Sequence, residues 1–340
     1  MKKVYTITFG DVAENHAKMQ KIGTLHEKGY SVEKLKKIDE KLKGYGLETE
    51  MIDLNVGNEF ADAKVLVIRR GAQYILGEET SGLMEENDEL TMDKKAFMKG
   101  RVVNKVARWN LCFADEDQEP DYEDGKGRIV AWKHIPRISR IREIISEWTE
   151  DVLLNGEANY YYDISQCGIG FHGDGERRKV FAVRMGETMS IYFKWYQNSK
   201  AVGEPFEVVL NDGDMYIMSE KAVGFDWLKK KIPTLRHSTG CSKFTGIKIA
   251  AEIEIEEKKE ALKEAKEAQK KKKEAELNAK KALIAEAKAA KLAEKEAQKK
   301  KKEAELNAKK ALIAEAKTAK LAEKEAQKKK KEAKLAVKKK

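Results

Sequence analysis

The chain has 340 residues, enough for one to three domains, and 37% of them are charged. Residues 257–340 carry 30 Lys and 15 Glu, a net charge of +15, whereas the whole chain carries +10, so the residues before them carry −5. The three cysteines are widely spaced, which argues against a disulfide scaffold or structural zinc and favours an intracellular, reducing compartment (cytoplasm or nucleus). The sequence has no apolar run of about 18 residues, which argues against a membrane partner.

Residues 1–78 read as a small α/β domain of unknown role. Residues 4–9 alternate like a β-strand, and residues 48–54 and 64–69 also read as strands. Ser31 can cap a helix over residues 32–43. Its spacing places four side chains on the buried face: Leu35, Ile38, Leu42 and Tyr45.

Residues 79–96 are acidic and rich in turn formers, which predicts a linker. The next segment holds a cationic, aromatic stretch and then an amphipathic helix over residues 138–148. Arg101, Lys105 and Arg108 have the character of a nucleic-acid contact surface. An ordinary solvated strand is the alternative, because the acidic loop at 115–125 should repel phosphate.

Three residues further along have the side chains and spacing of a metal site. His172 and Asp174 form an H-x-D pair, and His237 follows much later in the chain. Two imidazoles and one carboxylate are the donor set that holds non-haem Fe(II). Residues two apart on a strand point the same way, so His172 and Asp174 can reach one ion. Strands predicted between them and His237 can return the chain to that ion: 179–185, 189–196, 207–210 and 215–218.

The tail, residues 251–340, consists largely of Lys, Glu, Ala and Leu and contains a repeat. Lys266-Glu267-Ala268-Gln269-Lys270 recurs at Lys295 and again at Lys324, so the copies are evenly spaced. Their spacing is about eight turns of an α-helix, so each copy presents the same face. Leucines are too sparse for a coiled coil, so we expect a solvated basic helix that binds phosphate without reading sequence. A spacer without function is the alternative.

Several motifs of the central region occur in the order found in the AlkB family of Fe(II)/2-oxoglutarate dioxygenases. His172 to Arg177 resembles that family's H-x-D-x-E/D segment, and Asn159-Tyr160-Tyr161 resembles its N-x-Y. Residues 213–218 resemble its G-D-hydrophobic strand, and Arg236-His237 its distal histidine. The resemblance covers about residues 93–248. It implies a double-stranded β-helix, or jelly roll, over residues 97–250, so the chain as a whole is expected to be α+β.

The resemblance also implies a reaction and a role for each matching residue. Fe(II) held by His172, Asp174 and His237, together with 2-oxoglutarate and O₂, would remove N-methyl groups from nucleic-acid bases in repair or demethylation. A base must be flipped or single-stranded to reach such a site. The remaining roles fall on residues around the ligands: Asn159 and Tyr161 for 2-oxoglutarate, Lys243 and Lys248 where the family has its 2-oxoglutarate-binding arginines, Glu176 for the exocyclic amine of the base, and Arg177 and Arg178 for flanking phosphates.

Other interpretations of the same residues stay open. The tyrosines can be core residues, and the charges from Glu176 to Lys179 can be a solvated cluster. The negative net charge before residue 257 also permits a 2-oxoglutarate dioxygenase that hydroxylates a protein or a small molecule. A third class is a catalytically inactive jelly roll that binds nucleic acid through its tail.

Overall fold

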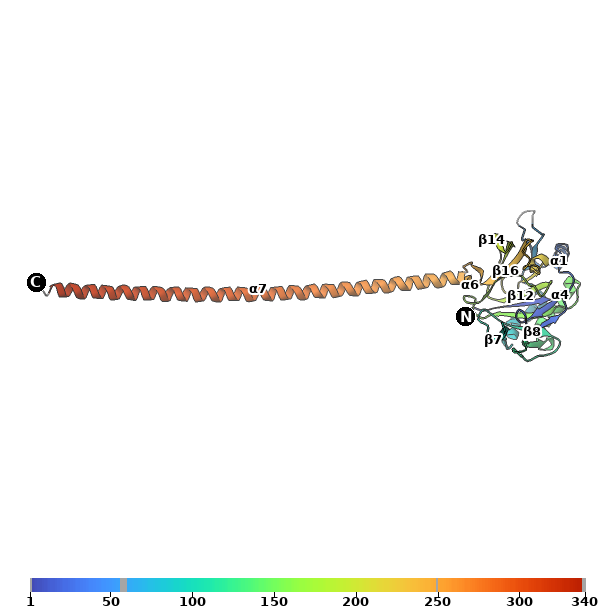
Figure 1. Cartoon of the computed structure of the whole chain (residues 1–340), viewed down its shortest axis with the longest axis horizontal. Helices are drawn as coiled ribbons and strands as arrows, with labels where there is room; N and C mark the ends of the chain where they lie inside the picture. The colour runs from blue at the N-terminus through green and yellow to red at the C-terminus, as the bar shows by residue number, and fades with distance from the viewer. Residues whose placement is uncertain (1, 56–59, 249, 338–340) are drawn as a thin grey trace. The chain divides into compact units, whose positions relative to one another are not determined.

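The computed structural model describes residues 2–55, 60–248 and 250–337, which fall into two compact units, Met1–Glu257 and Lys258–Lys340. The first unit is α+β and is built on two β-sheets (Figure 1). The second unit is helical.

The larger sheet has eight strands that come from distant parts of the chain. In spatial order they are β4 (Thr49–Asp53), β5 (Lys64–Ile68), β15 (Met215–Met218), β12 (Val180–Gly186), β1 (Val4–Gly10), β10 (Asn155–Tyr161), β8 (Trp109–Ala114) and β9 (Ile129–Ala131). Neighbouring strands are antiparallel except for β8 and β9, which are parallel.

The smaller sheet has four antiparallel strands, in the order β11 (Gly168–His172), β16 (Thr234–Gly240), β13 (Ile191–Gln197) and β14 (Lys200–Val208). The two sheets pack against each other through one apolar cluster, whose members include Val65, Val67, Val180, Ala182, Phe193, Trp195 and Leu235. Two short strand pairs lie outside these sheets: β2 (Val12–Glu14) with β3 (Lys21–Gly23), and β6 (Lys95–Met98) with β7 (Arg101–Asn104). The strands predicted from residue 179 to residue 218 are present, although β14 begins earlier than expected, at Lys200.

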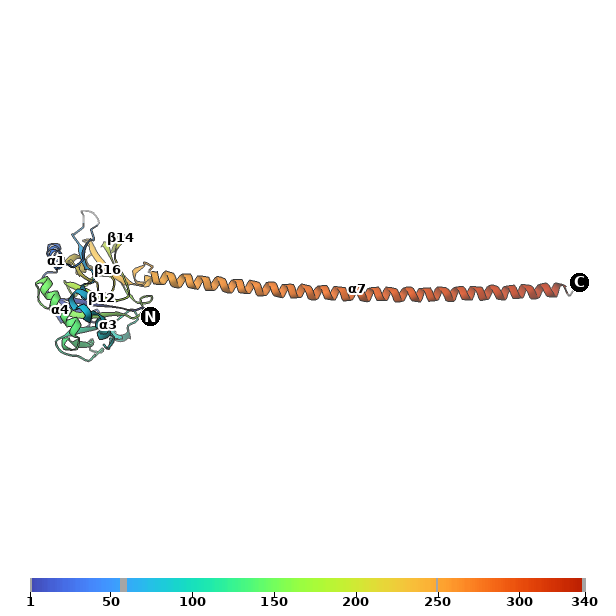
Figure 2. The same cartoon turned by 180° about the vertical axis from the view of Figure 1, so that it is seen from behind.

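Helices cover the other face of the large sheet (Figure 2). They are α1 (Val32–Gly44), α2 (Gly71–Leu76), α3 (Ser81–Asp88) and α4 (Pro136–Thr149), with two short helices elsewhere, α5 (Glu220–Val223) and α6 (Ser242–Thr245), and 3-10 turns η1 (Gly77–Thr80) and η2 (Trp132–His134). The Ser31 hydroxyl accepts the N–H of Lys34, which confirms the predicted cap of α1. Leu35, Ile38 and Leu42 are buried as predicted, but Tyr45 follows the last turn and is 49% exposed.

Residues 1–78 do not form the separate domain that the sequence predicted. Strand β1 lies between β12 and β10 in the middle of the large sheet, with Val4 opposite Tyr161 on one side and Gly186 on the other. Tyr5, Ile7 and Phe9 pack in the core beneath the helices, while the residues between them face the other way. Alternation identified this strand correctly, but it carries no information about which distant strands it joins.

The predicted linker at residues 79–96 is also wrong, because this segment folds into η1, α3 and the start of β6. Glu86 on α3 is only 8% exposed. Its carboxylate accepts the N–H groups of Arg137 and Ile138, each at 3.1 Å. Helix α4 starts after Ile135, whose side chain cannot cap it, so Glu86 supplies that acceptor from another helix.

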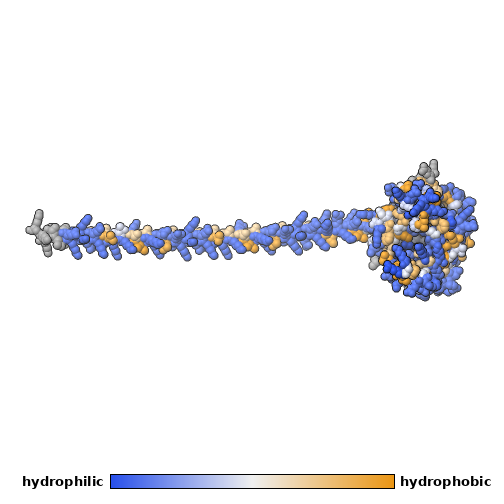
Figure 3. Space-filling view, viewed as in Figure 1, coloured by the Kyte–Doolittle hydropathy of each residue, from blue (hydrophilic) through white to orange (hydrophobic). Residues whose placement is uncertain are grey.

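The basic tail is helical as predicted. Helix α7 runs from Ala250 to Val337, and residues 338–340 lie outside the described part. Its surface is mainly Lys and Glu, with small apolar patches recurring along it (Figure 3). The exposed pairs Leu277 and Leu306, and Ile284 and Ile313, follow the spacing of the sequence repeat. In the described ranges no helix is long and apolar enough to cross a membrane.

We expect Glu86→Ala to lower the free energy of unfolding by about 1–2 kcal/mol, because two buried N–H groups at the start of α4 lose their acceptor. Chemical denaturation of the full chain measures this change. Glu85→Ala is the matched control: it removes the same charge from an exposed position of α3, and its effect should stay within about 0.5 kcal/mol. Equal losses in both variants would contradict the capping role.

Candidate metal centre and its pocket

The centre of the site is a pair of histidines on neighbouring strands. His172 ends β11, His237 lies within β16, and the two residues are directly opposite each other in the antiparallel register. Their rings are 4.5 Å apart between centroids and inclined by 61°. Opposite positions on antiparallel strands put their side chains side by side, so strand register alone brings together residues that are far apart in sequence.

Asp174 joins this pair from the loop that follows β11. Its Oδ1 lies 3.5 Å from Nε2 of His172 and 3.4 Å from Nε2 of His237. The loop passes close to α5: the N–H of Asp174 donates to the carbonyl of Val223 at 3.0 Å. A Cβ on Gly173 would meet the carbonyl oxygen of Gly224 at 2.2 Å, so glycine is needed for this approach.

Local hydrogen bonds and charges prepare these side chains to bind a cation. Nδ1 of His172 lies 2.8 Å from the carbonyl oxygen of Gly170, which favours the tautomer that leaves an Nε2 lone pair free. Burial and the nearby charge of His237 lower the pKa of His172 to about 3, so it is neutral at pH 7. Burial opposes the charge of Asp174, but His237, Arg177 and His172 together hold the pKa of its carboxyl below the usual range.

The three side chains can therefore act as one ligand set. One donor atom from each of His172, Asp174 and His237 lies within 4.8 Å of the others. Two imidazoles and a carboxylate on one side of an ion would leave its other side open, which is the arrangement of the facial triad for non-haem Fe(II). The structure thus brings together the three residues that the sequence singled out.

The triad opens into a pocket of about 600 Å³ that both sheets line. One wall is the large sheet, where Thr6 of β1 lies opposite Asn159 of β10 on one side and Arg184 of β12 on the other. All three residues line the pocket, and so does Tyr161, two residues beyond Asn159. The pocket therefore contains Asn159 and Tyr161, two of the four residues that the sequence assigned to 2-oxoglutarate.

Arg184 is a pocket residue that the sequence analysis missed. It is 1% exposed, and neither its Nε nor its Nη1 has a hydrogen-bond partner among the described residues. Thr6, the neighbour of Arg184 on the adjacent strand β1, likewise has a buried Oγ1 without a hydrogen-bond partner among the described residues. A buried guanidinium that lacks partners is costly unless an anion compensates it. The signal was present, because Arg184 interrupts the apolar run from Val180 to Met185.

Lys243 and Lys248, the predicted partners of 2-oxoglutarate, do not line this pocket. Lys243 is exposed on α6 with its ammonium 5.5 Å from the ring centre of Phe244. Lys248 is exposed and pairs with Glu256 at 2.6 Å. The structure does not bring either residue to the pocket of the triad, because the chain continues after β16 into the short helix α6.

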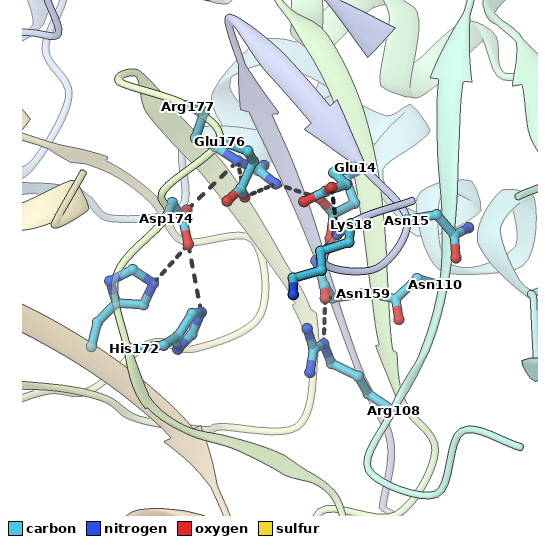
Figure 4. A network of polar contacts seen from close by, with 12 residues as sticks. Glu14, Asn15, Lys18, Arg108, Asn110, Asn159, His172, Asp174, Glu176 and Arg177 are labelled. Carbon is cyan, nitrogen blue, oxygen red and sulfur yellow. Dashed lines mark hydrogen bonds and ion pairs between the residues drawn. The ribbon is translucent and has the colours of Figure 1, made fainter. Parts of the chain in front are cut away.

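Arg177 is buried rather than available to phosphate, which corrects its prediction as a nucleic-acid contact. It is 4% exposed, and its Nη2 lies 2.5 Å from Glu157 while its Nε lies 2.9 Å from Glu176 (Figure 4). Its Nε is also 3.7 Å from Asp174 Oδ2, so this one guanidinium links the acidic side of the pocket to the triad. Glu176 lines the pocket as expected, and burial raises the pKa of its carboxyl.

The other predicted nucleic-acid contacts divide into two groups. Arg108 lines the pocket, where its Nε donates to Asn159 at 2.7 Å. Arg101, Lys105 and Arg178 do not line it. Lys105 is bound to Asn15 at 2.5 Å, and burial lowers the pKa of its ammonium to about 8. Arg178 pairs with Glu220 at 2.6 Å and covers Phe225, whereas Arg101 is exposed on β7. Arg178 and Lys105 are thus half-buried and have partners within the fold, and their role as nucleic-acid contacts stays a prediction.

Comparison with known proteins gives one family. No family model matches the chain. A protein of Acanthamoeba polyphaga mimivirus, described as uncharacterized, is 48% identical over 250 residues, which cover 72% of this chain and 98% of the viral protein. The aligned length is close to that of the compact unit Met1–Glu257. At this identity and coverage, the chain belongs to the same family as the mimivirus protein.

Proposed function

We propose that the protein is an Fe(II)- and 2-oxoglutarate-dependent dioxygenase that removes N-methyl groups from nucleic-acid bases. The observation that carries this proposal is the presence in one pocket of a His172–Asp174–His237 ligand set and a buried, unpartnered Arg184. A dicarboxylate cosubstrate needs both features, because one end must reach the metal and the other needs a cation. Two sheets packed around the triad support a double-stranded β-helix as the fold.

The residues of the pocket fit the metal and the cosubstrate. His172, Asp174 and His237 would hold the iron, and Arg184 with Thr6 would hold the distal carboxylate of 2-oxoglutarate. When bound, iron and 2-oxoglutarate supply the oxidising chemistry for which O₂ is the co-reactant. The chain itself holds the ligands in place: Asp174 is fixed by its backbone bond to Val223, and the strand register places His172 opposite His237.

Other parts of the chain support a nucleic-acid substrate. Trp227 and Leu228 lie at the pocket, and Leu228 is 72% exposed, which provides an apolar edge for a planar base. Residues 257–340 carry a net charge of +15, and on the described part of α7 the lysines from Lys258 to Lys331 are exposed. Such a tail raises the local concentration of nucleic acid and offsets the negative charge of the preceding residues.

Succinate release from 2-oxoglutarate with Fe(II) and O₂ tests the proposed reaction. We expect a single-stranded oligonucleotide with an N-methylated base to stimulate release and to yield formaldehyde, and His172→Ala to abolish both. His134→Ala is the control, since His134 is exposed and pairs with Asp117 outside the pocket. Release that needs His172 but ignores the oligonucleotide would move the substrate to a protein or small molecule. Release that survives His172→Ala would contradict the metal site.

Arg184→Met should raise the Kd for 2-oxoglutarate about tenfold or more, because a charge-assisted pair is lost. Titration of 2-oxoglutarate into the Mn(II)-loaded full chain without O₂ measures it apart from turnover. Lys243→Met and Lys248→Met are matched controls and should leave Kd unchanged. Thermal stability of Arg184→Met should not fall, because the variant removes an uncompensated buried charge. Weakened binding in the lysine variants alone would place the carboxylate near α6 instead.

Replacing the lysine runs 270–273, 299–302 and 328–331 by glutamine should weaken binding to a long single-stranded oligonucleotide and flatten its salt dependence, because phosphate neutralisation is lost. Circular dichroism should show that α7 is retained. Turnover of a short methylated oligonucleotide at low salt should stay close to that of the wild type. Equal binding by the charge-neutralised and wild-type chains, measured by fluorescence anisotropy, would exclude an electrostatic role of the tail.

A further inference from the structure

One wall of the pocket comes from the short hairpin of β2 and β3, to which the proposed reaction assigns no role. Its pocket-lining residues are Glu14, Asn15, His16, Ala17, Lys18 and Lys21. In the sequence this segment was expected to belong to a separate domain over residues 1–78. In the structure the hairpin is part of the site instead. It follows directly after β1, which lies in the middle of the large sheet, and its residues line the pocket.

The hairpin is held firmly on both sides of Glu14. Asp11, 2% exposed, accepts N–H groups from His26 at 2.9 Å and from Arg178 and Lys179 at 2.9 and 3.0 Å. Asn15, 3% exposed, donates to Asp93 at 2.7 Å and accepts from Lys105 at 2.5 Å. A side chain between two such anchors is preorganised, so Glu14 can contribute to binding without a large cost of ordering.

Glu14 is a buried carboxylate with little compensation. It is 7% exposed, and its Oε1 accepts one N–H, from Lys18 at 2.8 Å. Within the described ranges no ion pair joins it to a cation. Burial and the negative charge of Glu176 raise the pKa of Glu14 to about 7. A positive group in the pocket would stabilise this carboxylate.

The same side of the pocket is acidic as a whole. Glu157 and Glu176 line it beside Glu14, and Arg177 is the cation that pairs with both of them. Figure 4 shows Arg177 next to Glu176, with Asp174 on one side and Glu14 on the other. One guanidinium thus pairs with Glu157, Glu176 and Asp174, and Glu14 adds a further carboxylate that Arg177 does not pair with. Arg184 lies on another strand that lines the pocket, next to Thr6, where it would bind an anionic group.

We propose that Glu14 is a specificity-determining residue that selects a positively charged N-methylated base over a neutral one. Inside the pocket Glu14 would face the cationic ring, while Glu176 accepts from an exocyclic amine. Lys18 and Lys21 are exposed on the hairpin, so they can contact backbone phosphates of the nucleic acid that remain outside the pocket. This combination of inner carboxylates and outer lysines favours nucleic acid over a methylated protein side chain. The inference rests on the proposed function.

Binding of three probes to the Mn(II)-loaded full chain tests this inference apart from turnover. Two of the probes are single-stranded oligonucleotides of identical sequence. One carries 1-methyladenine, which is cationic at pH 7, and the other carries neutral N6-methyladenine. The third is a peptide with trimethyl-lysine. Glu14→Gln keeps an acceptor for the Lys18 N–H and removes the charge. We expect it to raise Kd for the cationic oligonucleotide about tenfold or more and to change Kd for the neutral one by less than about twofold.

Two further variants make the result interpretable. Glu14→Asp keeps the charge and should retain the preference for the cationic oligonucleotide, which separates charge from loss of structure. Glu204→Gln removes an exposed carboxylate from β14 and should change neither Kd. An unchanged ratio of the two Kd values in Glu14→Gln would overturn the inference. A different outcome is that the wild type binds the peptide but neither oligonucleotide, and that Glu14→Gln loses this binding. That outcome would overturn the nucleic-acid substrate and the selection of a cationic base, but Glu14 would still bind a cation.

Discussion

The antiparallel register of β11 against β16 determines where chemistry can occur in this protein. Because His172 and His237 are directly opposite, their rings lie side by side in the pocket, and Nε2 of each is within 3.5 Å of Asp174 Oδ1. A shift of one residue would turn His237 to the other face of β16 and dissolve the pair. Asp174 follows β11 in a loop that packs against α5, and only a glycine at position 173 allows the close approach to the carbonyl of Gly224.

Charge is segregated around that pair. Arg184 of β12 has no partner for its Nε and Nη1 among the described residues, while Arg177 is surrounded by Glu157, Glu176 and Asp174. Buried charges are expensive unless they are compensated. A pocket with an uncompensated cation on one strand and excess carboxylate on another wall therefore favours two different ligands, one anionic and one cationic. The proposed cosubstrate and the proposed methylated base have these charges.

The sequence located the parts of the site that depend on local patterns. The H-x-D pair, the distal His237 and the neighbouring Asn159 and Tyr161 lie in one pocket, as their motifs indicated. The helix at residues 32–44 and the long tail helix were also predictable, since capping and helical periodicity are local. Glu14 and Arg184 were not found. Their importance depends on the pairing of β1 with β10 and β12, two strands that lie far from β1 along the chain, and no local pattern encodes that pairing.

The same limit explains the errors. The acidic residues 79–96 resembled a linker because the partners of Glu86 are far away in the sequence. Glu86 is buried against the start of α4, where it accepts the N–H groups of Arg137 and Ile138. Arg177 resembled a phosphate contact because its partner Glu157 lies on a different strand. Charged residues in a sequence are more often exposed than buried, so a buried ion pair is recognised only when the fold is known.

A crystal structure of the full chain grown with Mn(II) and 2-oxoglutarate in the absence of O₂ is the most direct test of this account. The account predicts anomalous scattering from one ion bound by His172, Asp174 and His237, with the free carboxylate of 2-oxoglutarate against Arg184. An ion bound elsewhere, or 2-oxoglutarate bound away from Arg184 while the metal is in place, would contradict it.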